Sequence, residues 1–135
     1  MRAVIDTNIL VMCLSSTSPY HLIYQKLIQQ AYEIAVSSEI VLEYCEIISR
    51  KYDKHTALLL EELLLELPNV KKSETYFKWN LITEDPDDNK FRDCAISAGV
   101  DFIVTEDKHF NILKKIDFPK VRVIGIEDFL KLLEN

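Results

Sequence analysis

The sequence predicts an α/β protein, a three-layer α/β/α sandwich with a mainly parallel central sheet. Short apolar runs alternate along the chain with segments of helical apolar spacing, and this alternation favours parallel strands with helices on both faces. The hydrophobic fraction of 48% is enough for a core without disulfides or a structural metal. The length of 135 residues suits one domain spanning residues 1–135.

In the first half of the chain, two short apolar runs at 2–5 and 33–36 are predicted strands. Residues 19–31 carry apolar side chains at helical spacing. The second strand leads into a helix that is capped by Ser37 or Ser38 and continues through SEIVLEYCEIISRKY. This order predicts two strands, each followed by a helix.

A leucine-rich helix is predicted at 56–67, ended by Pro68-Asn69. Its seven leucines form too wide a stripe for a helix with one solvated face. Two interpretations stay open with equal weight. The helix is either deeply buried in the core or presents a surface to a second subunit or partner.

The second half begins with 70–82, where a short strand is possible. The run EDPDDN (84–89) predicts a turn and a helix start, because Pro and Asp favour turns and caps. The remaining predicted elements are a helix at 89–98, a strand at 101–105, a helix at 108–115, a strand at 121–124 and a helix at 126–133.

The composition excludes several classes of protein. Cys13, Cys45 and Cys94 are odd in number and lack zinc spacing, which indicates reduced core residues in a reducing compartment. The only glycines, Gly99 and Gly125, are too few for a phosphate-binding or dinucleotide-binding loop. The sequence shows no signal peptide and no apolar stretch near the roughly 20 residues that span a bilayer, so we expect a cytoplasmic protein.

Acidic side chains stand at the ends of predicted strands. Asp6 directly follows the first strand, and Asp107 comes two residues after the strand 101–105. Glu43 lies one to two turns into the helix after the second strand, among mostly apolar neighbours. The EDPDDN run adds further acids, although each one alone is better explained as a helix cap. Because sites in open parallel sheets form beyond the carboxyl ends of the strands, these acids are expected to converge.

A carboxylate cluster has a specific chemical consequence. Like charges about 4 Å apart repel by roughly 4 kcal/mol at an effective dielectric of 20, so the cluster needs a cation or raised pKa values. Oxygen ligands favour magnesium or manganese, which can activate water for in-line attack on a phosphodiester. His21, His55 and His109 show no ligand spacing. The net charge of −6 is unfavourable for binding nucleic acid unless metal ions or a local basic patch supply positive charge.

Three segments of the chain resemble the PIN domain nucleases: AVIDTNIL (3–10), SSEIVLEYCEII (37–48) and DPDDNKFRDCAISAGVDFIVTEDKHF (85–110). The last is the most specific and is similar to the branch regarded as toxins of toxin–antitoxin systems. The resemblance runs over nearly the whole chain and is weakest at 53–80. It implies a ribonuclease that uses one or two Mg²⁺ or Mn²⁺ ions, frequent homodimers and, as in VapC-type relatives, inhibition by a cognate antitoxin.

Carried over by position, the resemblance implies a catalytic and metal-binding quartet of Asp6, Glu43, Asp88 and Asp107. Thr7 and Asn8 would shape the first loop, and Thr105 would form a hydrogen bond near the metal site. Candidates for holding the RNA backbone are Lys90, Arg92, Lys108, Lys114 and Lys115. Most of these basic residues, taken alone, are better explained as solvated surface side chains.

Asp93 is an alternative to Asp88 as the third acid. The two lie five positions apart, about 140° around an ideal helix, so they cannot share a face if the helix is regular at Asp88. If Asp88 instead caps the helix, both can approach the site. We rank Asp88 first.

Two other functions are weighed against a ribonuclease. A receiver-type phosphoacceptor domain has similar length and sheet order, but here the second strand ends in Ser37-Ser38 and the first carries a single Asp before Thr-Asn. A catalytically silent PIN-fold interaction module would explain the leucine face at 58–67. It would not explain why four mutually repelling acids are present.

Overall fold

The protein is built on a five-stranded parallel sheet, seen here in a computed structural model that describes residues 1–74, 89–115 and 121–134. The strands are β1 Arg2–Ile5, β2 Glu33–Val36, β3 Val70–Lys72, β4 Phe102–Val104 and β5 Val123–Ile124. They run in the order β3-β2-β1-β4-β5, and every neighbouring pair is parallel. The predicted α/β class with a parallel sheet is confirmed.

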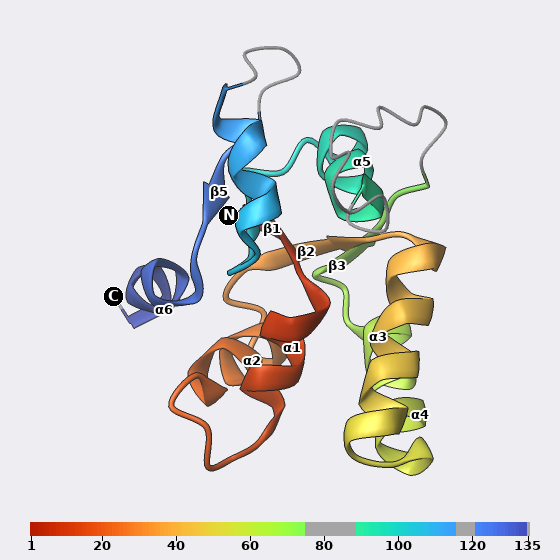
Figure 1. The fold of residues 1–135 in the computed structure, drawn as a ribbon. Helices are drawn as coiled ribbons and strands as arrows, with labels where there is room; N and C mark the ends of the chain where they lie inside the picture. The colour runs from red at the N-terminus through yellow and green to blue at the C-terminus, as the bar shows by residue number, and fades with distance from the viewer. Residues whose placement is uncertain (75–88, 116–120, 135) are drawn as a thin grey trace.

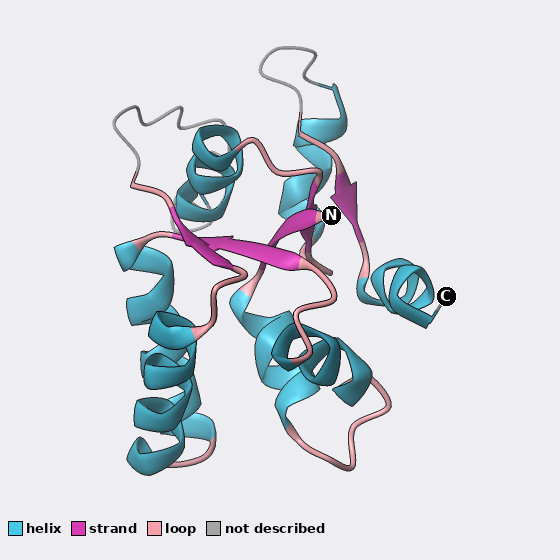
Figure 2. Ribbon diagram, turned by 180° about the vertical axis from the view of Figure 1, so that it is seen from behind, coloured by secondary structure: helices cyan, strands magenta, loops and turns pink. Residues whose placement is uncertain are grey.

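Helices cover both faces of this sheet (Figure 1). They are α1 Thr7–Leu14, α2 His21–Ile28, α3 Ser38–Lys51, α4 Lys54–Glu66, α5 Asn89–Ala98, the 3-10 helix η2 Lys108–Lys115 and α6 Ile126–Glu134. Helix α5 and η2 lie on one side, and α1 to α4 lie on the other, as the reverse view in Figure 2 also shows. No helix in the described part of the chain is long and apolar enough to cross a membrane.

Helix α1 was not predicted from the sequence. Its residues are apolar almost all round, and Ile9, Leu10, Val11 and Cys13 are all buried. Such a segment has no polar face, so the helical period on which sequence prediction relies is absent. Thr7 and Asn8 therefore begin a helix instead of shaping a loop, which corrects the expectation for these two residues.

The leucine-rich helix α4 buries only one of its faces. Leu60 and Leu64 are 3% and 5% exposed and pack into the core. Leu58, Leu59 and Leu65, in contrast, are 52%, 53% and 72% exposed. The interpretation of α4 as a deeply buried helix is therefore wrong, and an exposed apolar surface is what its leucine excess produces.

The sheet order creates one switch point. From β1 in the centre, the chain builds β2 and β3 on one side and later β4 and β5 on the other. The crossovers therefore diverge between β1 and β4, and in open parallel sheets this leaves a crevice beyond the carboxyl ends of those strands. Ile5 and Val104 are paired in register at those ends, so the residues that follow them, Asp6 and Thr105, become neighbours.

Candidate active site

The side chain of Asp6 is directed to the neighbouring strand end. Its backbone N–H donates to the Val104 carbonyl at 3.0 Å, and its own carbonyl accepts from Ile9 and Leu10, which starts α1. The carboxylate forms no capping bond with that helix. Instead, its Oδ2 accepts a hydrogen bond from the Thr105 hydroxyl at 2.8 Å, and the residue is only 6% exposed.

The charge of this carboxylate is poorly compensated. Burial raises the pKa of Asp6 from 3.8 to about 6, although hydrogen bonds from the Thr105 hydroxyl and the Thr7 amide favour its ionised form. The negative charges of Glu43 and Asp107 raise this pKa further. The three acids are therefore within electrostatic range of one another, at a place where a cation would relieve their repulsion.

Glu43 is held by contacts to both of its oxygens. The Thr7 hydroxyl donates to Oε2, and the Lys90 ammonium lies 2.7 Å from Oε1. The next residue along α3 fixes the helix itself, because the buried Tyr44 hydroxyl donates to the Ile5 carbonyl at 2.5 Å. Since Ile5 is the last residue of β1, this bond secures α3 beside the strand end that carries Asp6.

Asp107 is joined to Asp6 through Thr105. The Thr105 hydroxyl donates to Asp6 and accepts a hydrogen bond from the Asp107 amide at 3.0 Å. The Asp107 carboxylate contacts a residue two positions further along. Its Oδ1 accepts a hydrogen bond from the His109 amide at 2.9 Å and lies 3.3 Å from His109 Nδ1. Asp107 thus acts as a cap at the start of η2.

The predicted quartet is only partly visible. Asp6, Glu43 and Asp107 lie around Thr7 and Thr105, but Asp88 falls outside the described residues. Within the described ranges, no three histidine, cysteine or acidic side chains stand close enough together to hold a metal ion. In this structure Glu43 contacts Lys90, and Asp107 contacts the start of η2.

Helix α5 buries polar residues. Asp93, the alternative third acid, is 4% exposed, and Asn89 is 6% exposed. Arg92 is completely buried, and this burial lowers the pKa of its guanidinium to about 10, against the opposing effect of the Asp93 charge. The guanidinium is therefore not at the surface, which corrects the expectation that Arg92 holds the RNA backbone.

The other predicted basic residues differ in position. Lys90 contacts Glu43, and Lys108 is exposed at the start of η2. The side chains of Lys114 and Lys115 lie outside what the structure describes. Sequence patterns could not predict that Lys90 pairs with Glu43, because the two residues are 47 positions apart and on different helices.

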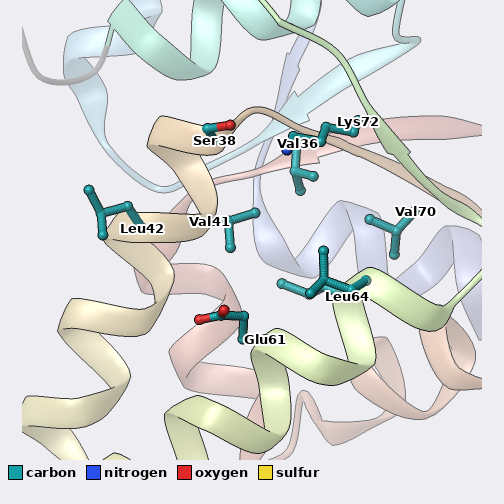
Figure 3. A pocket seen from close by; sticks show the side chains of 9 residues that line it. Val36, Ser38, Val41, Leu42, Glu61, Leu64, Val70 and Lys72 are labelled. Atoms are coloured by element: carbon teal, nitrogen blue, oxygen red, sulfur yellow. The ribbon is translucent and has the colours of Figure 1, made fainter.

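A second concave surface lies away from the carboxylates, between α3, α4 and β3 (Figure 3). It is a mainly apolar groove with a volume of about 390 Å³. Its lining residues are Val36, Ser38, Val41, Leu42, Glu61, Leu64, Leu65, Val70 and Lys72. Asp6, Glu43 and Asp107 are not among the residues that line this groove.

Fold and site together define an open parallel α/β protein with acidic side chains at its switch point. The sequence profile of the PIN domain matches residues 2–109, and the chain belongs to the PIN domain family, as its motifs predicted.

The fold is also that of two solved structures. A chain of VapBC2 from Rickettsia felis, bound to a DNA fragment from their promoter, is 18% identical, with a TM-score of 0.62 over 93% of this chain and 98% of that one. A chain of VapBC-1 from nontypeable Haemophilus influenzae is 15% identical, with a TM-score of 0.58 over 94% and 99%. No curated protein matches the sequence.

Proposed function

We propose that this protein is a metal-dependent endoribonuclease that cleaves RNA phosphodiester bonds. The observation that carries the proposal is the buried Asp6 carboxylate, whose pKa is raised to about 6 beside the charges of Glu43 and Asp107. It lies at the switch point of a PIN domain sheet, where ligands of open α/β proteins bind. A buried acid with a raised pKa at such a position is typical of functional sites.

The donor chemistry fits Mg²⁺ or Mn²⁺. The acids offer only oxygen ligands, which suit hard cations, and a cation would offset the charge that raises the Asp6 pKa. Asp6, Glu43 and Asp107 would hold one or two ions, with Asp88 or Asp93 as the further ligand. Such an ion lowers the pKa of water and polarises the phosphodiester.

The remaining residues of the site orient these ligands. Thr105 fixes the Asp6 carboxylate, and Thr7 fixes Glu43, so each hydroxyl removes rotational freedom from an acid. Lys108 is exposed next to Asp107, and we propose that it holds a phosphate of the RNA backbone.

Cleavage of single-stranded RNA by the purified protein, in Mn²⁺ or Mg²⁺ and in EDTA, tests the proposal. We expect activity only with the metal. Asp6→Asn should lower it by at least about 100-fold, since losing even a group that only orients a metal ligand costs about 10- to 100-fold. Asp101→Asn is the matched control, because Asp101 is exposed at the amino end of β4. The candidate site lies at the other, carboxyl ends of the strands. Cleavage by Asp6→Asn at the wild-type rate would refute the assignment.

A silent interaction module is the second candidate, favoured by the exposed leucines of α4. The same assay separates the two candidates. Wild-type protein that cleaves no RNA with either metal, yet melts at a normal temperature, would leave the interaction module as the better explanation.

We further propose that the protein is the toxin of a toxin–antitoxin pair that acts in the cytoplasm. The support is the likeness of its fold to chains of VapBC structures, and the three free cysteines suit a reducing compartment. Induced expression in a bacterium should stop growth, Asp6→Asn should not, and co-expression of a small neighbouring gene should restore it. Equal growth arrest by wild type and Asp6→Asn would contradict a toxic nuclease.

A further inference from the structure

We propose that Lys90 is an internal counter-ion of the carboxylate site. Its ammonium holds Glu43 while the site contains no metal ion, and it gives up this contact when a divalent cation binds. This inference rests on the metal site of the proposed function. It assigns to Lys90 a positioning role toward Glu43 that differs from the RNA contact predicted from the sequence.

The contact is close and partly shielded from solvent. Lys90 Nζ lies 2.7 Å from Glu43 Oε1, and the two side chains are 16% and 25% exposed. Thr7 already donates to the other oxygen, Oε2. Lys90 therefore contacts Oε1, the Glu43 oxygen that does not accept the Thr7 hydrogen bond.

The position of Lys90 in α5 argues against a role in helix stability. It is the second residue of the helix, where the positive end of the helix dipole disfavours a cation. Its Nζ also lies 5.8 Å from the centroid of the Phe91 ring, where the ring weakly attracts the ammonium. The charge of Glu43 offsets the unfavourable effect of the helix dipole.

The ammonium and a metal ion would repel each other if both contacted Oε1. A magnesium ligand oxygen lies about 2.1 Å from the ion, so an ammonium retained at the same oxygen would face a divalent charge at close range. Under the proposal, this repulsion displaces Lys90 when the metal binds. The free energy needed to break the Lys90–Glu43 contact weakens metal binding. The same contact stabilises the metal-free protein.

Titration of the purified protein with Mn²⁺ in a calorimeter tests this exchange. Lys90→Met should bind Mn²⁺ about tenfold more tightly than wild type, since a competing charge is removed. Lys90→Arg, which keeps the charge, should bind like wild type. The matched control is Lys71→Met, because Lys71 pairs with Glu33 at 3.8 Å, at the amino end of β2 and away from the site. It should leave the affinity unchanged.

Thermal melting supplies a second readout. In EDTA, Lys90→Met should melt below wild type, because Glu43 has lost its counter-ion. At saturating Mn²⁺ the two proteins should melt at the same temperature, since the metal replaces the ammonium. A difference that persists unchanged in Mn²⁺ would mean that the ion pair is permanent, and would overturn the proposal.

A double-mutant cycle with Glu43→Gln separates exchange from simple repulsion of charge. In the Glu43→Gln background, Lys90→Met should no longer change the Mn²⁺ affinity. An unchanged tightening there, or weaker binding by Lys90→Met alone, would overturn the exchange while leaving the metal site intact. Absence of Mn²⁺ binding by wild type would instead overturn the metal site and the exchange together.

Discussion

Asp6 combines a buried position with a negative charge. The Thr105 hydroxyl stabilises the ionised carboxylate, but burial outweighs this effect and raises the pKa to about 6. Because the pKa of the folded state exceeds the ordinary value of 3.8, the folded protein binds this proton more tightly than the unfolded chain. Its stability contribution is thus fully present below about pH 4 and is lost as the pH rises through about 6.

Replacement of Asp6 by Asn should therefore stabilise the metal-free protein at neutral pH. The ionised carboxylate costs up to about 3 kcal/mol above pH 6, and Asn keeps an oxygen that can accept from Thr105. In EDTA, Asp6→Asn should exceed wild type in the free energy of unfolding by about 1–3 kcal/mol at pH 7.5, and by much less at about pH 4.5.

Urea denaturation at the two pH values measures this difference. Asp101→Asn, whose carboxylate is exposed, serves again as the control and should show no such pH dependence. A variant at position 6 that is less stable than wild type at pH 7.5 would contradict the account of Asp6.

At the scale of the elements, α4 shows how neighbouring leucines come to differ in burial. Helix α4 packs against α3 and β3, and Leu64 and Leu65 both line the apolar groove. Leu64 and Leu65 are adjacent in the sequence but are 5% and 72% exposed. The helical turn of about 100° between them decides which one belongs to the core.

Truncation of these two leucines should have unequal effects on stability. Leu64→Ala should lower the free energy of unfolding by about 2–5 kcal/mol, because it leaves a cavity in the core. Leu65→Ala should change it by less than about 0.5 kcal/mol. Chemical denaturation at several protein concentrations measures both effects. A large, concentration-dependent loss for Leu65→Ala would show that a second copy covers this face.

At the scale of the whole molecule, the site depends on the order of the strands. Asp6 and Thr105 are 99 positions apart and meet because β1 and β4 are neighbours in the sheet. Glu43 joins them because α3 is fixed to the end of β1 by Tyr44. The net charge of −6 adds to the repulsion among these acids, and so favours a function in which a cation is bound before RNA.

The sequence by itself determined the strands, most of the helices and the acids at their ends. These features are local, since short apolar runs, helical spacing and cap residues lie within a few positions of one another. The strand-end rule predicted that Asp6 and Asp107 lie at the same end of the sheet, and Thr105 joins them there by hydrogen bonds. Helix α1 was missed because its side chains are apolar on almost every face, so no helical period marks it in the sequence.

Only the tertiary structure decided which groups these side chains contact. The burial of Arg92, the capping of η2 by Asp107 and the pairing of Lys90 with Glu43 all depend on packing between segments far apart in the sequence. The identity of a basic residue in the sequence does not tell whether its side chain faces solvent, the core or an acid. Its role is fixed by burial and by the distance to the opposite charge, which exist only once the chain has folded.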